Sequence, residues 1–165
     1  MKRYVKADII SNPTPSGYRK HRSTEDQLAL LAQEIENVFQ GKKKTVVVFY
    51  DLSMAFDKVW RDGLLLKVIQ AGVSGRMYTW IRCFLHDRSA RVKVDGHLSD
   101  SVKMREGVPQ GVVVSRTLFL VYINNLTTVI PRHVSNTLHA DDLAIWSSAE
   151  YTTSAAYRMQ DAANK

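Results

Sequence analysis

The feature that most constrains the fold is an apolar run that ends in an acid. Residues 45–52 read TVVVFYDL and directly follow a run of three lysines. An unbroken run of β-branched and aromatic residues of this length is typical of a buried strand. A strand needs neighbours for its backbone hydrogen bonds, so we expect the chain to fold around a sheet. Asp51 lies at the end of this strand, in a sequence otherwise too apolar to favour a carboxylate.

Helical periodicity separates the expected strands. Apolar side chains at three- and four-residue spacing follow Ser23, which can cap a helix that Gly41 stops. Further helices are expected over 62–72, over 74–86 and from Ser115.

Two hairpins are also expected. The first turns at Asp95-Gly96, the strongest short hairpin signal in the chain, and the second lies around Asp141-Asp142, between two apolar segments. Helices that alternate with strands and hairpins in this way indicate an α+β fold with a mostly antiparallel sheet.

Length and composition restrict the class of protein. The 165 residues, 45% of them hydrophobic and 24% charged, suit one soluble globular domain. No apolar run approaches the roughly 18 residues that a membrane span needs, and the N-terminus lacks the apolar stretch of a secretory signal. Cys83 is the single cysteine, so no disulfide partner is evident within the chain. We expect an intracellular, soluble protein without a membrane partner.

The charge points to a polyanionic partner. Lys and Arg number 23 against 16 Asp and Glu, which leaves a formal net charge of +7. The excess is concentrated in residues 1–25 and 76–105. Nucleic acid is therefore the first partner to test, although an ordinary solvated basic face would give the same count.

Three carboxylates in apolar settings carry the chemical signal. They are Asp51, Asp141 and Asp142. Two such charges 4 Å apart repel by about 4 kcal/mol at an effective dielectric constant near 20, so clustered carboxylates either take up protons or hold cations. Oxygen ligands suit Mg²⁺, and two such ions can assist an in-line phosphoryl displacement. The alternative is that an Asp-Asp pair at a turn is only a turn, and the spacing alone does not place Asp51 beside it.

Five segments, in this order, resemble the reverse transcriptases of non-long-terminal-repeat (LINE-type, jockey-like) retrotransposons. They are SGYRKHRSTEDQL, FYDLSMAFDKVW, WIRCFLHDRSARVKVDG, GVPQGVVVSRTLFLVYINNL and LHADDLAIW. The resemblance runs from about residue 3 to about residue 150. It implies a polymerase palm, in which an antiparallel sheet packs on helices, together with partial fingers and no thumb. Residues 1–165 would be a single reverse transcriptase domain fragment, divided into partial fingers (1–44), palm (45–150) and a truncated tail (151–165) that forms only the beginning of the next helix.

The resemblance assigns a catalytic and metal-binding role to the three carboxylates. Asp51, Asp141 and Asp142 would hold Mg²⁺, with Mn²⁺ as a substitute. Phe56 would act as the gate against a ribose 2′-hydroxyl, although a buried core aromatic is the alternative reading. Asp57 would be structural or on the template side and not a metal ligand.

Further residues would contact the nucleotide, the primer and the template. Gln110 and Gly111 would lie against the incoming nucleotide, and Arg19 and Arg22 would bind its triphosphate through their guanidinium groups. Primer and template support would come from Pro109, His139 and Ala140. Taken alone, Pro-Gln-Gly is only a turn and either arginine is an ordinary exposed charge.

Some positions depart from the family pattern. His139 stands where Tyr is usual, Asn125 where Asp is usual, and Arg116 where Pro is usual. A proline is preorganised for a first helical turn, whereas a cation there opposes the helix dipole. None of these changes removes a catalytic carboxylate, but together they suggest relaxed selection or a decayed copy.

The implied function is that of an RNA-directed DNA polymerase, which is a nucleotidyltransferase. Its partners would be an RNA template, a DNA primer and deoxynucleoside triphosphates, and this truncated copy would have little activity alone. The alternative is a catalytically inactive remnant of a retroelement that still binds nucleic acid. A third reading, an unrelated helical interaction protein, leaves the clustered acids unexplained. Loss of divalent-ion binding on substitution of Asp51 separates the first reading from the second.

Overall fold

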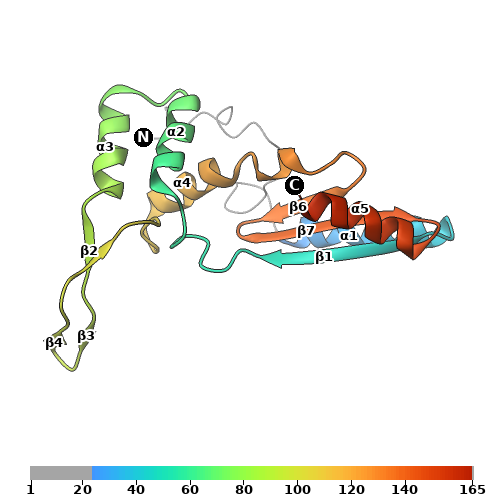
Figure 1. The fold of residues 1–165 in the computed structure, drawn as a ribbon, viewed down its shortest axis with the longest axis horizontal. Coiled ribbons are helices and arrows are strands. Elements are labelled where there is room, and N and C mark those ends of the chain that lie inside the picture. The colour runs from blue at the N-terminus through green and yellow to red at the C-terminus, as the bar shows by residue number, and fades with distance from the viewer. Residues whose placement is uncertain (1–23, 165) are drawn as a thin grey trace. The chain divides into compact units, whose positions relative to one another are not determined.

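The computed structural model describes residues 24–164, which form two compact units. Residues 24–53 and 123–164 make the sheet unit, and residues 54–122 make the helix–arm unit. Both are visible in Figure 1, where the elements are labelled. The expected α+β class with antiparallel pairing is confirmed. No helix of the described chain is long and apolar enough to cross a membrane.

The sheet unit is built on three antiparallel strands. β1 (Lys44–Asp51) and β6 (Ser135–His139) flank the central β7 (Asp142–Ala149). The run TVVVFYDL therefore forms the expected strand, but not a buried one. β1 lies at an edge of the sheet, and its residues are half-buried or exposed. The strand buried on both faces is β7, whose residues 144–147 are all buried.

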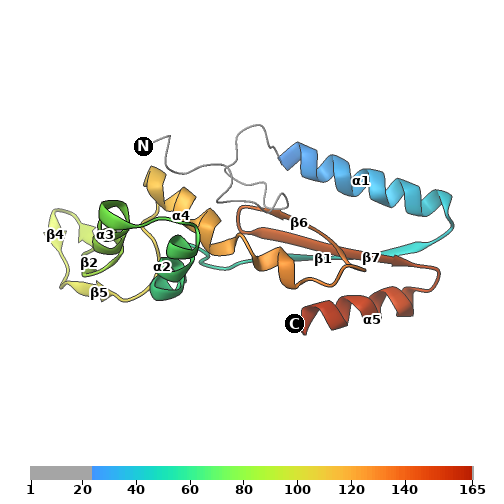
Figure 2. The same ribbon diagram turned by 90° about the horizontal axis from the view of Figure 1, so that it is seen from above.

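Helices cover both faces of this sheet. In Figure 2, α1 (Thr24–Gln40) lies on one side of the strands and α5 (Thr152–Ala163) on the other. The core beneath α5 is formed by Val134, Ile145 and Met159. Half-buried apolar residues pack around it, namely Val46, Val48, Ile130, Leu143 and Ala162.

The tail is more regular than expected. Residues 151–165 were expected to form only the beginning of a helix, whereas α5 is 12 residues long. Its buried residues Ala155 and Met159 lie four positions apart and so share one face of the helix. The tail becomes helical because this apolar face packs on the sheet.

The helix–arm unit begins with two helices, α2 (Arg61–Gln70) and α3 (Gly75–Leu85). A third, α4 (Val113–Ile123), starts two residues before the predicted Ser115 and ends at the border with the sheet unit. It is followed in the sheet unit by a short 3₁₀ helix, η2 (Leu126–Val129). The most deeply buried side chains of the helix–arm unit include Leu64, Val68, Leu85 and Phe119.

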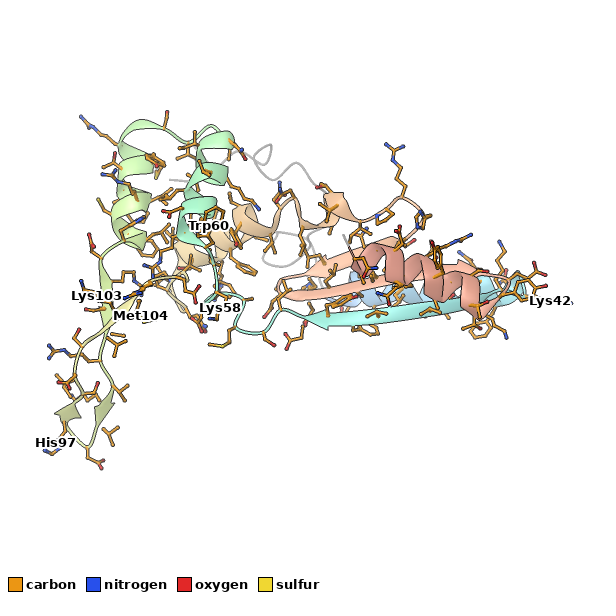
Figure 3. The ribbon with its side chains drawn as sticks, in the orientation of Figure 1. Lys42, Lys58, Trp60, His97, Lys103 and Met104 are labelled. Carbon is orange, nitrogen blue, oxygen red and sulfur yellow. The ribbon has the colours of Figure 1, made fainter. Side chains whose placement is uncertain are left out.

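A two-stranded arm extends from these helices, as Figure 1 shows. At its base β2 (Arg88–Ala90) pairs with β5 (Val102–Met104), and at its tip β3 (Lys93–Val94) pairs with β4 (His97–Leu98). The predicted turn is confirmed, because Asp95 and Gly96 have φ of +47° and +82°, the positive values that a type I′ turn requires. His97 marks the tip in Figure 3.

Candidate active site

The sheet register places two of the three predicted carboxylates opposite each other. Asp51 is the last residue of β1, and its partner in β7 is Asp142, the first residue of that strand. Directly opposed residues of an antiparallel pair have Cβ atoms about 4.5–5.5 Å apart and point to the same face. His139 is the partner of Asp142 on the other side, in β6. Asp51, Asp142 and His139 therefore form a row across the end of the three strands.

The third carboxylate belongs to the turn between β6 and β7. The loop of this predicted hairpin consists of Ala140 and Asp141, one position earlier than an Asp141-Asp142 turn. Ala140 is buried and has φ of +55°, a left-handed conformation that costs a non-glycine residue about 1–2 kcal/mol. Strained backbone of this kind clusters at functional sites.

Backbone hydrogen bonds continue past the end of β1 and join the residue after this strand to the turn. The Leu52 N–H donates to the carbonyl oxygen of Asp141 at 3.2 Å, and the Ser53 N–H donates to the carbonyl oxygen of Asp51 at 3.0 Å. The three aspartates are thus brought to one end of the sheet by the main-chain hydrogen bonds of the ladder and of this turn.

A cavity of about 310 Å³ adjoins the row of side chains. Asp51, His139 and Asp142 line it at one end of the sheet, and Leu28 and Leu31 of α1 line it as well. The remaining lining residues are Phe49, Tyr50, Thr137, Leu143 and Ala144. The cavity therefore joins an apolar wall to an acidic end.

The electrostatics of this end of the sheet favour a cation. Asp51 and Asp142 are exposed, and neither takes part in the ion pairs found among the described residues. Like charges that face each other across two strands are destabilising. In residues 24–164 no three His, Cys, Asp or Glu side chains are arranged as a preformed metal site. An opposed carboxylate pair still fits Mg²⁺, which is commonly bound through one or two carboxylates together with substrate phosphates.

The predicted nucleotide-contacting residues of the helix–arm unit lie close to one another. Phe56 is half-buried and stacks on Phe119, with ring centroids 4.3 Å apart and planes inclined by 20°. The Val108 N–H, one residue before Pro109, donates to the carbonyl oxygen of Phe56 at 2.8 Å. The stack agrees with the core-aromatic reading of Phe56, and its role as a gate stays a prediction.

The Pro-Gln-Gly loop is attached to the same segment. Gln110 Nε2 donates to Asp57 Oδ2 at 3.0 Å, which agrees with a structural role for Asp57. Pro109 is half-buried, whereas Gln110 and Gly111 are exposed. Gly111 has φ of +78° and no atom within 4 Å of where a Cβ would lie, so open space surrounds this glycine.

Two predicted residues, Arg19 and Arg22, lie outside the described residues. Two other features were not predicted. One is the cavity beneath α1, for which the three-residue spacing of Leu28 and Leu31 and the alternation of Phe49 with Asp51 are the available signals. The other is Arg61, an arginine with only 5% of its surface exposed, for which the sequence holds no signal.

Comparison with known proteins gives a consistent family. Residues 2–164 match the family model described as reverse transcriptase (RNA-dependent DNA polymerase). Over 151 residues the chain is 32% identical to a probable RNA-directed DNA polymerase from transposon BS of Drosophila melanogaster, a match that covers 88% of this chain and 17% of that protein. It is 30% identical over 151 residues to the RNA-directed DNA polymerase from mobile element jockey of the same species, covering 88% of this chain and 16% of that protein.

A solved structure has a similar fold. It is apo telomerase from Candida tropicalis, truncated from the C-terminal domain, with a TM-score of 0.60 and 12% sequence identity. The match covers 91% of this chain and 32% of that chain. The chain spans about a sixth of the length of the curated relatives named above.

Proposed function

Because the chain belongs to the reverse transcriptase (RNA-dependent DNA polymerase) family, we propose that its aspartates bind divalent ions for RNA-directed DNA synthesis. The reaction joins the 3′-hydroxyl oxygen of a DNA primer to the α-phosphorus of a deoxynucleoside triphosphate. The bond from that phosphorus to the bridging oxygen breaks, pyrophosphate leaves, and the hydroxyl proton is lost. An RNA strand serves as template. The observation that carries this proposal is the opposition of Asp51 and Asp142 in the last pair of the β1–β7 ladder.

The carboxylates of Asp51, Asp141 and Asp142 would hold the metal. Reverse transcriptases generally use divalent metal ions, and we propose Mg²⁺, with Mn²⁺ as a substitute. When bound, such ions stabilise both the attacking and the leaving oxygen of an in-line displacement. The carboxylates would orient the ions, and the exposure of Asp51 and Asp142 at the strand ends leaves their oxygens open to ligands.

Other residues of the chain would position the substrates. We assign nucleotide contacts to Gln110 and Gly111, and discrimination against the 2′-hydroxyl to Phe56. Support for the primer and template is assigned to Pro109, His139 and Ala140. Arg19 and Arg22 would bind the triphosphate, because planar guanidinium groups suit phosphate oxygens.

Metal titration tests this proposal. Mn²⁺ binding in the presence of a deoxynucleoside triphosphate is measured for the chain and for Asp51→Asn, Asp141→Asn and Asp142→Asn. Each substitution removes one charged ligand, so we expect the affinity for Mn²⁺ to fall by about tenfold or more. Asp95→Asn, at the exposed tip of the arm, is the matched control and should leave binding unchanged. Binding that is the same in all four variants would refute the metal assignment.

A second candidate function, nucleic-acid binding without catalysis, is favoured by the arm. Arg91, Lys93 and Lys103 are exposed on it, and none takes part in the ion pairs found among the described residues. Cations that neutralise phosphates release counterions, so affinity falls with salt. Replacing all three by Ser should reduce the slope of log K against log salt by about 2–3 without any dependence on metal.

The matched control for the arm removes three lysines elsewhere. Lys42, Lys43 and Lys44 are exposed at the start of β1, in the sheet unit. Replacing these three by Ser changes the net charge by the same amount but should leave the slope almost unaltered. Equal slopes for both triple variants would show that net charge alone, and not the arm, sets the affinity.

A further inference from the structure

Arg61 is a buried cation that reaches three main-chain oxygens and no carboxylate. Its Nε donates to the carbonyl oxygen of Gly107 at 2.9 Å, its Nη1 to that of Met104 at 2.7 Å and its Nη2 to that of Glu106 at 2.6 Å. Neither ion pair found among the described residues includes it. Burial, followed by the nearby charge of Arg88, lowers the pKa of Arg61. Burying a charge is costly unless hydrogen bonds satisfy it, and these three bonds engage each of the three guanidinium nitrogens.

The segment that Arg61 holds has no regular structure of its own. β5 ends at Met104 and α4 starts at Val113, and the residues between them are in neither helix nor strand. Figure 3 shows this junction beside the labelled Lys58 and Met104. A loop without strand partners must satisfy its carbonyl groups in another way. Here one guanidinium does so for two of them, those of Glu106 and Gly107, and also binds the carbonyl oxygen of Met104 at the end of β5.

The main chain of this segment also packs closely against the segment that precedes α2. The Gly107 N–H donates to the carbonyl oxygen of Val59 at 2.8 Å. Gly107 has φ of +82°, and a Cβ at this position would lie 2.6 Å from the carbonyl oxygen of Asp57. Pro109 follows two residues later, so any displacement at Gly107 is transmitted directly to the Pro-Gln-Gly loop.

We propose that Arg61 is a positioning residue that fixes the Pro109-Gln110-Gly111 loop by binding the carbonyl oxygens of Met104, Glu106 and Gly107. The inference rests on the proposed function, in which this loop contacts the incoming nucleotide. A lysine can replace the arginine only in part, because a guanidinium presents five donors in a fixed planar fork whereas the three donors of an ammonium share one nitrogen.

Lys58 provides a matched control within the same contact. Its Nζ donates to Glu106 Oε1 at 2.8 Å, so it also joins the segment before α2 to the 104–107 segment. The side chains of Lys58 and Glu106 are 61% and 51% exposed, however, and water replaces their interaction readily. The two cations thus touch the same loop, one from the interior and one from the surface.

Hydrogen exchange in the whole chain measures the positioning directly. In Arg61→Met we expect the amides of Gly107 and Val108 to exchange at least about tenfold faster, because the loop loses three hydrogen bonds. Arg61→Lys should show a smaller increase and Lys58→Met none. The amides of β1 and β7 report whether the sheet unit remains folded. If the β1 and β7 amides of Arg61→Met also exchange faster, that variant is not folded, and the exchange at Gly107 and Val108 is then judged from Arg61→Lys.

Nucleotide affinity, measured with Mn²⁺ on the same variants, separates positioning from mere folding. We expect Arg61→Met and Gln110→Ala each to weaken deoxynucleotide binding by about tenfold, with partial recovery in Arg61→Lys. Unchanged exchange at Gly107 in both Arg61 variants would overturn the proposal. So would faster exchange together with unchanged affinity, provided that Gln110→Ala weakens binding. A third outcome is that the loop amides exchange faster in Arg61→Met while neither Arg61→Met nor Gln110→Ala changes nucleotide affinity. In that case Arg61 does position the loop, but the loop does not contact the nucleotide.

Discussion

The proposed site residues of the two units are held in place in different ways, the aspartates by a strand ladder and the Pro-Gln-Gly loop by individual contacts. In the sheet unit, Asp51 and Asp142 are the last of eight residue pairs in a regular backbone ladder. In the helix–arm unit, the Pro109-Gln110-Gly111 loop is attached by the side chains of Arg61 and Asp57 and by isolated main-chain bonds. A ladder distributes its support over many groups, whereas the loop depends on a few. The carboxylates should therefore tolerate the loss of any polar neighbour, and the loop should not.

The largest effect is expected where the ladder has its apolar support. Ile145 is 3% exposed and packs with Val134 and Met159 in the core of the sheet unit. Ile145→Ala removes buried methyl groups and leaves a cavity, so we expect the free energy of unfolding to fall by about 2–5 kcal/mol in urea denaturation.

The control for this substitution is Leu30→Ala. Leu30 is 48% exposed on α1, and its loss should change the free energy of unfolding by about 0.5 kcal/mol or less. If Leu30→Ala were as destabilising as Ile145→Ala, apolar contacts on the α1 side would support the ladder as much as the core beneath α5 does.

A smaller effect separates backbone strain from close packing in the helix–arm unit. Gly107 and Gly96 both have φ of +82°, but only Gly107 faces a neighbour, with Asp57 backbone atoms 2.6–2.9 Å from a Cβ placed there. Gly96→Ala should cost about 1 kcal/mol through its left-handed conformation alone. Gly107→Ala should cost about 1–3 kcal/mol more, because the added methyl group must displace the loop.

Calorimetric comparison of these two glycine variants measures that difference. A clear excess for Gly107→Ala supports the close approach of the loop to Asp57. Equal costs for both variants would mean that the loop moves freely, and the contrast between ladder and loop would then lose its physical basis.

The same contrast explains how much the sequence could predict. The strand over 45–52 and the hairpin around Asp141-Asp142 follow from side-chain patterns, and their pairing brings the carboxylates together. The edge position of β1 was missed, because a run of β-branched residues does not reveal whether a strand pairs with a neighbour on one side or on both. Arg61 was missed as well, since its partners are carbonyl oxygens, which every residue possesses.

The smallest expected effect concerns the surface contact of the loop. A hydrogen bond from Lys58 to Glu106 and the charge of that carboxylate raise the pKa of Lys58 above its ordinary value of 10.5. The stability that this pair contributes is therefore fully present below pH 10.5 and is lost as the pH rises through the raised pKa of the folded protein. It should also fall in 1 M salt, because the Debye length is then about 3 Å.

We therefore expect Lys58→Met to be slightly less stable than the unchanged chain at pH 8 and low salt, and the difference in stability to shrink as the pH rises above 10.5 or in 1 M salt. Chemical denaturation under these three conditions measures the difference, and Arg61→Met serves as the reference. The destabilisation by Arg61→Met should persist in high salt, because its partners are uncharged carbonyl groups and screening acts mainly between exposed charges. A Lys58→Met effect that survived both conditions would show that the exposed contact supports the loop by packing. The loop would then have two structural attachments of the same kind, and Arg61 would lose its distinction from Lys58.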